Sequence, residues 1–165
     1  MAETDLPKLI VFDLDFTLWS TGGVWIDCTT WPFTERDGRI FDADEREFKL
    51  YPDVEEILQQ LLSSQTPLAL ASRTSQPDWA RWVLETWDLR GIFQFEEIYP
   101  GSKTAHFESL RRQTGHAFED MLFFDDEARN IDEVGQLGVT AELVKNGVDR
   151  ASFERGLAHW RSSQT

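Results

Sequence analysis

The stretch VFDLDFTLW, residues 11–19, decides how the fold of this chain is interpreted. Four apolar residues at positions 9–12 run directly into Asp13 and Asp15, which are separated by a single leucine. A short, continuous apolar run is typical of a strand that is buried on both faces of a parallel sheet. Burying an unpaired charge is costly, so two carboxylates at the exit of such a strand require a physical reason.

Short apolar runs alternate with helical patterns along the rest of the chain. Strands are predicted at residues 9–12, 67–71, 95–99, 121–124 and 140–144. Helices are predicted at about residues 54–62, from 75–77 onward, at about 104–113 and 130–137, and around 153–160. This alternation predicts an α/β fold, a three-layer, doubly wound (Rossmann-like) parallel sheet of about five strands with helices on both faces.

The segment at about residues 19–51 interrupts this alternation. It has no clear helical pattern, but Gly-Gly and Asp-Gly pairs are turn signals, so we expect a flap or hairpin in which Cys28 is packed. Its aromatic residues, which can cover the core or form a lip over a site, are Trp25, Trp31 and Phe33. The segment is too short for a second domain, so residues 1–165 are expected to form a single domain without a separate cap.

The composition excludes several classes of protein. Thirty acidic residues against sixteen basic ones give a net charge of −14, which disfavours nucleic acid and anionic membranes as partners. The single cysteine, Cys28, allows no internal disulfide. The first eight residues, MAETDLPK, lack the apolar core of a signal peptide, and no apolar run approaches the ~18 residues of a membrane span. We therefore expect a soluble, cytoplasmic protein that acts as a monomer.

Polar side chains follow several of the predicted strands at the point where each strand ends. In parallel sheets of this kind, ligands bind beyond the carboxyl ends of the strands. Lys103 is expected in the loop after the third predicted strand, at the same edge. The residues expected to converge there are Asp13, Asp15, Ser72, Lys103, Asp125 and Asp126.

These residue types match the requirements of phosphoryl transfer, which needs a nucleophile, cations around the phosphate oxygens and a proton donor. A carboxylate can act as the nucleophile, provided that a hard cation such as Mg²⁺ offsets its repulsion of the phosphate. Asp13 and Asp126 can supply oxygen ligands for that cation, and Asp15 can carry a proton. Ser72 can donate a hydrogen bond to the phosphate, and Lys103 can screen its charge.

The motifs resemble those of a known superfamily. The segment FDLDFTL resembles the DxDxT motif of the haloacid dehalogenase superfamily of phosphotransferases. Ser72 after PLALA resembles the second motif, Lys103 the third, and the segment FFDDEARN at residues 123–130 the acidic fourth. Together the motifs look most like the small, capless magnesium-dependent phosphatases of that superfamily, of the acid phosphatase type.

The resemblance implies a role for each acidic residue. Asp13 is the implied nucleophile, which forms an aspartyl-phosphate. Asp15 is the implied general acid and then base, and it lends its backbone carbonyl to Mg²⁺. Asp126 is the favoured metal ligand of the acidic pair, with Asp125 beside the metal or orienting Lys103. The missing cap implies an open site, suited to phosphotyrosine, protein-bound phosphates or phosphosugars.

Simpler structural roles compete with these interpretations. Ser72 taken alone can be an N-cap residue, and Lys103 taken alone can be a solvated surface lysine. Arg73 follows Ser72 as it does in relatives with an SRT segment, so it either helps to hold the phosphate or forms a structural ion pair. Thr17 is expected to stabilise the turn through nearby backbone, and Asn130 to cap or open the helix after the acidic pair.

Two other functions remain open at this point. A signalling receiver domain also stores phosphate on an aspartate, although its acidic pair follows the first strand rather than the fourth. A glyceryl-loading domain for acyl carrier proteins shares the DLDxTLW opening, although it normally belongs to a longer chain. The net charge of −14 disfavours a third function, a polynucleotide phosphatase.

Overall fold

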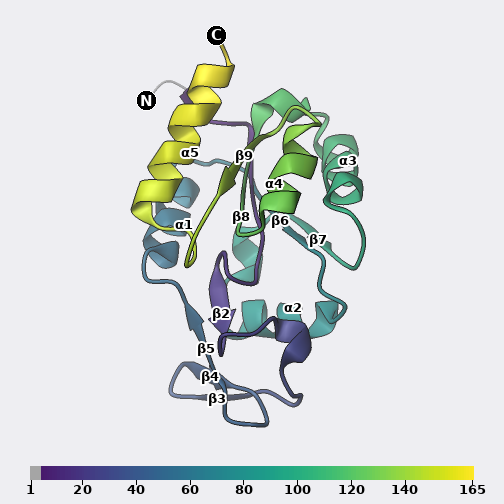
Figure 1. Ribbon diagram of the computed structural model, residues 1–165. Coiled ribbons are helices and arrows are strands. Elements are labelled where there is room, and N and C mark those ends of the chain that lie inside the picture. Colours follow the sequence, from purple (N-terminus) through teal and green to yellow (C-terminus); the bar gives the residue numbers. More distant parts are fainter. Residues whose placement is uncertain (1–4) are drawn as a thin grey trace.

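The computed structural model describes residues 5–165. Residues 1–4 lie outside the described residues. They form the first half of the segment MAETDLPK, which is not expected to be a signal peptide. A five-stranded parallel sheet is the centre of the molecule, with the strand order β7-β6-β1-β8-β9 (Figure 1). Its strands are β1 (Leu9–Phe12), β6 (Leu68–Ser72), β7 (Phe95–Ile98), β8 (Met121–Asp125) and β9 (Thr140–Leu143).

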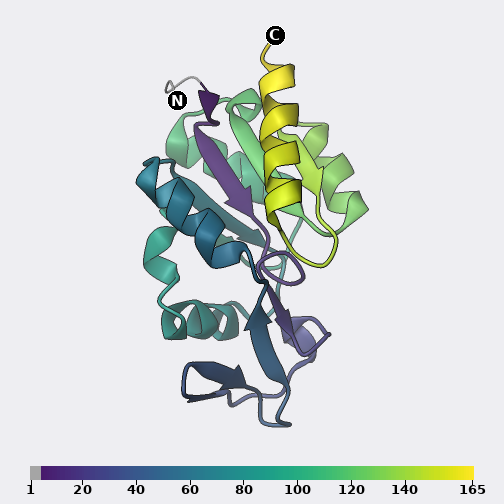
Figure 2. The same cartoon turned by 90° about the vertical axis from the view of Figure 1, so that its left-hand side faces the viewer.

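Helices cover both faces of this sheet (Figure 1, Figure 2). The helices are α1 (Val54–Ser63), α2 (Pro77–Thr86), α3 (Lys103–Thr114), α4 (Ala128–Gly135) and α5 (Arg150–Ser163). Short 3-10 turns lie at η2 (Ile26–Cys28), η3 (Arg90–Ile92) and η4 (Phe118–Asp120). The predicted three-layer, doubly wound α/β fold is confirmed, and the predicted strands and helices agree with the observed ones to within a few residues.

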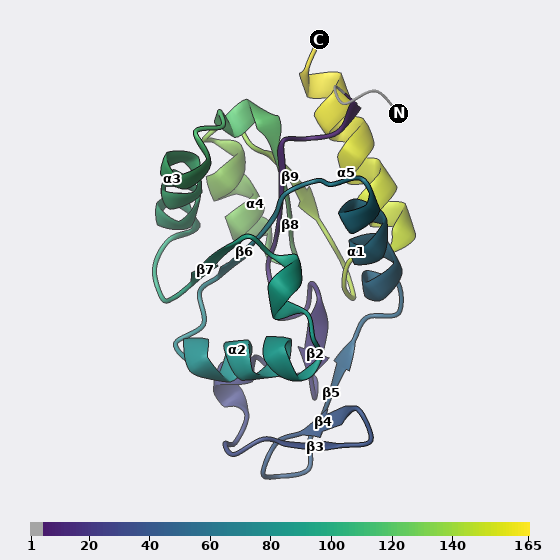
Figure 3. The same ribbon diagram turned by 180° about the vertical axis from the view of Figure 1, so that it is seen from behind.

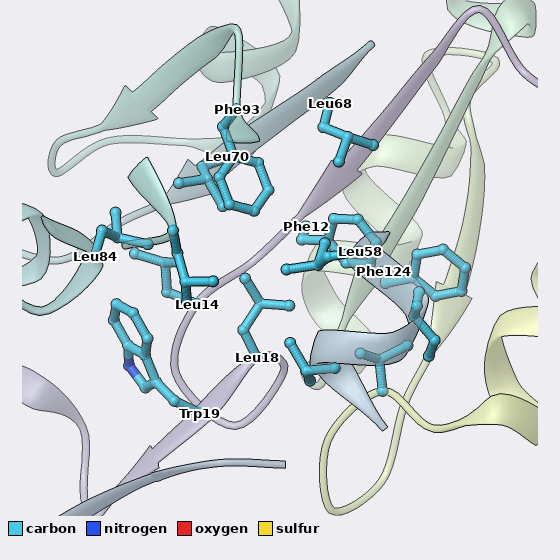
Figure 4. Packing of buried hydrophobic residues seen from close by; sticks show 14 of the residues in the cluster. Phe12, Leu14, Leu18, Trp19, Leu58, Leu68, Leu70, Leu84, Phe93 and Phe124 are labelled. Carbon is cyan, nitrogen blue, oxygen red and sulfur yellow. The ribbon is translucent and has the colours of Figure 1, made fainter. Parts of the chain in front are cut away.

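Strand β1 shows why both faces are covered, because its four side chains alternate between two separate hydrophobic clusters. Ile10 and Phe12 belong to the cluster that includes buried residues of α1, α2 and α5. Leu9 and Val11 belong to the cluster with buried residues of α3 and α4. Phe12 stacks on Phe124 of β8 at a ring-centroid distance of 5.4 Å, inside the cluster that Figure 4 shows. A strand with two apolar faces is therefore buried on both sides.

The segment at about residues 19–51 is more ordered than the predicted hairpin, because it forms a second, antiparallel sheet with the order β2-β5-β4-β3. Its strands are β2 (Trp19–Thr21), β3 (Thr34–Arg36), β4 (Arg39–Phe41) and β5 (Glu47–Leu50). We refer to residues 19–51 as the flap.

Aromatic side chains join the flap to α2, which lies beside it in Figure 3. Trp31 stacks on Trp79 of α2 at 5.9 Å, and Phe33 meets the same ring at 5.5 Å. Phe33 is buried, whereas the side chains of Trp25 and Trp31 are 53% and 43% exposed. Within residues 5–165, no helix has both the length and the apolar character needed to cross a membrane.

The chain order places a topological switch at β1. The chain runs outward from β1 through β6 to β7, and then crosses back to β8 on the other side of β1. Phe12 and Phe124 are aligned partners, so β1 and β8 end side by side. The residues that follow them therefore face the crevice in which ligands of such sheets bind.

Candidate active site

A cavity of about 250 Å³ lies at the carboxyl edge of the parallel sheet. Six residues that the sequence analysis singled out line it, namely Asp13, Asp15, Ser72, Arg73, Lys103 and Asp126. Asp125 is fully buried beside this cavity, in contact with Lys103. The residues that line the cavity without having been assigned to the site are Trp25, Asp27, Thr74, Glu127, Arg129 and Asn130.

Asp13 follows β1 directly, and its backbone N–H donates to the carbonyl of Phe124 at 3.1 Å. Its carboxylate accepts hydrogen bonds from Lys103 Nζ at 3.1 Å and from Thr17 Oγ1 at 3.3 Å. Burial raises the pKa of Asp13 to about 7, and the charges of Asp126 and Asp15 add to this effect while Lys103 opposes it. Without further positive charge, the carboxyl group of Asp13 is therefore protonated in about half of the molecules near neutral pH.

Lys103 is the first residue of α3, not part of the preceding loop as predicted. Only 1% of it is exposed, and its Nζ lies 3.1 Å from Asp13 Oδ1 and 3.3 Å from Asp125 Oδ2. Nζ also donates to the carbonyl of Ala71 in β6. A solvated surface role for Lys103 is therefore wrong, because its cation lies between two carboxylates inside the fold. A buried cation needs such partners.

Asp15 is held by the flap rather than by the parallel sheet. Its Oδ1 accepts from Trp19 Nε1 at 2.8 Å, and its Oδ2 accepts from the backbone N–H of Ile26 at 2.9 Å. Phe16, with a φ of 63°, turns the chain directly after Asp15. Burial raises the pKa of Asp15 to about 6, against the effect of the two hydrogen bonds. A carboxyl group with such a pKa can donate and accept a proton near neutral pH.

The acidic pair at the end of β8 divides into a buried and an accessible carboxylate. Asp125 Oδ1 accepts from the backbone N–H of Glu127 at 2.8 Å, and its Oδ2 accepts from Asn130 Nδ2 at 3.0 Å. Burial and the charge of Asp13 raise the pKa of Asp125 to about 7. Asp126 lines the cavity, and burial and the charge of Asp125 raise its pKa to about 6.

The carboxylates at this edge fit a hard divalent cation. One oxygen from each of Asp13, Asp125 and Asp126 lies within 4.8 Å of the other two. Carboxylate oxygens are the ligands that Mg²⁺ takes in proteins, and burial together with the neighbouring carboxylates raises the pKa of all three groups. The carboxylate of Asp15 does not belong to this group, since it faces Trp19 and Ile26.

The opposite wall of the cavity comes from β6 and the loop after it. Ser72 is the last residue of β6, and its Oγ accepts from the backbone N–H of Thr74 at 3.3 Å. Arg73 lines the cavity, and no carboxylate of residues 5–165 lies within 4.0 Å of it, although its charge helps to lower the pKa of Glu133. Arg129 is exposed and pairs with Glu127 at 3.4 Å.

Three residues differ from their expected structural roles. The hydroxyl of Thr17 donates a hydrogen bond to the carboxylate of Asp13 rather than to nearby backbone. Asn130 lies inside α4 and donates to Asp125, so it neither caps nor opens the helix. Cys28 is exposed rather than packed, because η2 turns it away from the core.

Some of the additional cavity residues could have been predicted from the sequence, and others could not. Glu127, Arg129 and Asn130 follow the acidic pair within four residues, so their proximity was a usable signal. Trp25 was one of the flap aromatics expected either to cover the core or to form a lip over a site, whereas nothing in the local pattern marks Asp27, which lies far along the chain from β6. Asp27 accepts from Thr74 Oγ1 at 2.5 Å, a contact that spans 47 residues of sequence.

Comparisons with known proteins show which family the chain resembles. The sequence model of a family described as acid phosphatase matches residues 5–163. The human protein named magnesium-dependent phosphatase 1 is 45% identical over 162 residues, which cover 97% of this chain and 90% of the human one. A haloacid dehalogenase-like hydrolase superfamily protein of Schizosaccharomyces pombe is 36% identical over 170 residues, covering 94% of this chain and 96% of that protein.

A solved structure has the same fold. The haloacid dehalogenase-like hydrolase of Streptococcus pneumoniae superimposes with a TM-score of 0.64 over 92% of this chain and 91% of that one. At 14% sequence identity, this similarity concerns the fold alone.

Proposed function

The chain belongs to the acid phosphatase family, as a magnesium-dependent phosphatase of the haloacid dehalogenase superfamily, and on that premise we propose that it hydrolyses phosphomonoesters through an aspartyl-phosphate on Asp13. The observation that supports this most directly is the position of the Asp13 carboxylate. It lies at the cavity, beside a buried lysine and within 4.8 Å of two further carboxylates.

The first half of the reaction needs a nucleophile and an acid. A carboxylate oxygen of Asp13 attacks phosphorus, and the bond between phosphorus and the ester oxygen breaks. Asp15 gives its proton to the departing oxygen, so that an alcohol leaves and the phosphoryl group remains on Asp13. The hydrogen bonds from Trp19 and Ile26 hold the Asp15 carboxyl group in place while its charge changes.

The second half returns the enzyme to its starting state. Asp15, now ionised, takes a proton from a water molecule as the water oxygen attacks phosphorus. The bond to Asp13 breaks, inorganic phosphate leaves, and Asp15 carries the proton needed for the next cycle. One group can serve as acid and then as base because its pKa of about 6 lies near the working pH.

The residues that would hold Mg²⁺ are Asp13 and Asp126, with Asp125 beside them and the backbone carbonyl of Asp15 as a further oxygen ligand. When bound, the ion supplies the positive charge that keeps the Asp13 carboxylate ionised and neutralises the phosphate oxygens. Asp125 already accepts hydrogen bonds from Glu127 and Asn130, which fix the orientation of its carboxylate. Such outer contacts help to hold metal-binding groups in place.

The phosphate oxygens need donors on the side away from the carboxylates. Lys103 Nζ lies 3.1 Å from Asp13, close enough to screen the nucleophile from the phosphate charge. Ser72 and Arg73 line the same cavity, and no carboxylate of residues 5–165 lies within 4.0 Å of the guanidinium of Arg73. An arginine can bind two phosphate oxygens at once, so Arg73 is the strongest candidate anchor for the phosphate.

The substrate side of the cavity is open, with the exposed ring of Trp25 at its edge. We propose phosphotyrosine, protein-bound phosphates or phosphosugars as the substrate classes, since an open site accepts a bulky leaving group. The net charge of −14 argues against nucleic acid and membrane partners. We further propose that the protein works as a monomer in the cytoplasm, where its single cysteine would remain a thiol.

Phosphoenzyme trapping tests the proposal. The wild-type protein should hydrolyse 4-nitrophenyl phosphate with Mg²⁺ and lose this activity in excess EDTA, and Asp13→Asn should form no phosphoenzyme. Asp15→Asn should lose ~10²–10⁴ in rate, more for alkyl than for 4-nitrophenyl esters, because 4-nitrophenol leaves without a proton. Full turnover by Asp13→Asn, or one slow stoichiometric phosphorylation without turnover, as in a receiver domain, would refute the proposal.

A further inference from the structure

The turn η2 of the flap contacts both sides of the cavity through two consecutive residues. The backbone N–H of Ile26 donates to the carboxylate of Asp15 at 2.9 Å. The next residue, Asp27, lines the cavity and turns its carboxylate toward the loop after β6. One short turn therefore joins the proposed proton carrier to the wall that holds Ser72 and Arg73.

Both carboxylate oxygens of Asp27 bind that loop. Oδ1 accepts from Thr74 Oγ1 at 2.5 Å, and Oδ2 accepts from the backbone N–H and the hydroxyl of Ser75 at 2.9 and 2.5 Å. Partial burial opposes ionisation, but the hydrogen bonds from Ser75 and Thr74 hold the pKa of Asp27 below its usual range. Asp27 is therefore an anion at neutral pH.

An anion that lines a phosphate-binding cavity needs an explanation, because it repels the substrate. Asp27 cannot attract a phosphate, and its oxygens are already taken by Thr74 and Ser75. Its charge adds to the raised pKa of Asp15, and its hydrogen bonds order the loop after β6. The backbone N–H of Thr74 donates to Ser72 Oγ at 3.3 Å, and that of Gln76 donates to Thr74 Oγ1 at 3.0 Å. The Asp27 contacts thus continue through Thr74 to the side chain of Ser72.

We propose that Asp27 is a positioning residue for phosphate binding, which ties η2 to Thr74 and Ser75 and so fixes the loop that begins with Arg73 after Ser72. This inference rests on the proposed phosphatase function, and it adds a residue outside the four motifs. Asp27 acts through the loop and does not touch the phosphate itself.

A positioning role for Asp27 and a role that only stabilises the fold predict different kinetics for the variants. If Asp27 only stabilised the fold, its loss would lower the thermal midpoint or the active fraction, and KM would stay constant. If Asp27 positions the loop, its loss weakens phosphate binding in the folded enzyme. KM for 4-nitrophenyl phosphate and Ki for inorganic phosphate should then rise together, by about tenfold, which corresponds to about 1.4 kcal/mol.

The experiment compares three variants of the whole chain in the presence of Mg²⁺. Asp27→Ala removes both acceptor oxygens, and Asp27→Asn keeps one of them. We expect KM and Ki to rise about tenfold in Asp27→Ala and about threefold in Asp27→Asn, on the scale of tenfold per 1.4 kcal/mol. Asp44→Ala is the matched control, because Asp44 lies in the same flap, accepts from Thr30 Oγ1 at 2.6 Å and does not line the cavity. Its KM and Ki should match those of the wild type.

Amide hydrogen exchange gives a readout that does not depend on activity. Exchange at Ser75 and Gln76 should accelerate in Asp27→Ala and stay unchanged in Asp44→Ala. Unchanged KM, Ki and exchange in a folded Asp27→Ala protein, or an equal rise in Asp44→Ala, would overturn the inference while the wild-type activity upholds the phosphatase function. A wild-type protein without Mg²⁺-dependent turnover would overturn the phosphatase function and the positioning role with it.

Discussion

Replacing Asp126 by asparagine is expected to stabilise the metal-free protein and to abolish its response to Mg²⁺. Carboxylate oxygens of Asp126, Asp13 and Asp125 lie within 4.8 Å of one another. The carboxylates that Lys103 contacts are those of Asp13 and Asp125, at 3.1 and 3.3 Å, so among residues 5–165 Asp126 has no cation within 4.0 Å. Asparagine keeps the shape of the side chain and removes this unbalanced charge.

The magnitude follows from the spacing of the carboxylates. Two unit charges about 5 Å apart repel by about 3 kcal/mol at an effective dielectric constant of about 20. Lys103 offsets part of this repulsion, so we expect a net gain of about 1 kcal/mol for Asp126→Asn in EDTA. For a chain of this size that gain raises the thermal midpoint by about 2–4 °C. In the wild type, Mg²⁺ at about 100 times its Kd should add about 2.7 kcal/mol, or about 5–10 °C.

The gain in EDTA should also depend on pH. Burial and the neighbouring Asp125 raise the pKa of Asp126 in the folded protein to about 6, above the usual value of 3.8 for an aspartate. When the pKa of a carboxyl group is higher in the folded than in the unfolded state, the folded state holds the proton more tightly. The protein therefore loses stability as the pH rises through the folded pKa, because the folded state must then give up its proton. The advantage of Asp126→Asn should therefore be larger at pH 8 than at pH 5.

Thermal unfolding followed by circular dichroism, in EDTA and in increasing Mg²⁺, measures both effects. Asp132→Asn is the matched control, because Asp132 is exposed on α4 and does not line the cavity. It should respond to Mg²⁺ like the wild type. If Asp126→Asn is less stable than the wild type in EDTA, or if Mg²⁺ stabilises it equally, the proposed arrangement of charges is wrong.

Three further predictions concern single side chains. Thr17→Val removes the donor to Asp13, so kcat should fall about tenfold, about 1.4 kcal/mol, while Thr17→Ser stays near the wild type in the same assay. Trp25→Ala should reduce kcat/KM for phenyl phosphate several-fold more than kcat/KM for a sugar phosphate, because an aryl group stacks on an exposed ring. Trp31→Ala is the control, since Trp31 lies outside the cavity, and it should leave the ratio of the two kcat/KM values unchanged. Burial lowers the pKa of His106 to about 4, so the unfolded chain takes up its proton first as the pH falls from 6.5 to 4. Between pH 6.5 and pH 4, the free energy of unfolding measured by urea titration should fall by up to about 3 kcal/mol more in the wild type than in His106→Gln. Equal falls in the two proteins would contradict this account of His106.

The parallel sheet could be predicted because its strands carry a local signal. The runs at residues 9–12, 67–71 and 121–124 are short, continuous and followed by polar residues, whereas β7 and β9 each contain glutamate. Parallel strands end at a common edge, so the exits of β1, β6 and β8 had to lie close together. The placement of Asp13, Ser72 and Asp126 around one cavity follows from that geometry and needs no knowledge of side-chain contacts.

The flap could not be predicted in the same way, because its sheet and its site contacts depend on partners far along the chain. The Asp27 carboxylate bonds Ser75, which is 48 residues away, and Trp31 stacks on Trp79. Neither contact has a periodic signature. Lys103 was misplaced for a related reason, since a loop residue and the first residue of a helix look alike in sequence.

The DxD pair itself shows what structure adds to a motif. Sequence places Asp13 and Asp15 on one short turn but does not distinguish their surroundings. Burial raises the pKa of Asp13, and its carboxylate also faces the ammonium group of Lys103 and two carboxylates, so the charge bound beside it adjusts its proton affinity further. Asp15 faces two neutral N–H donors, from Trp19 and Ile26, so its proton affinity depends mainly on burial. A cation that binds the three carboxylates would therefore ionise Asp13 with a smaller effect on Asp15, and this difference is what a nucleophile and a proton carrier two residues apart require.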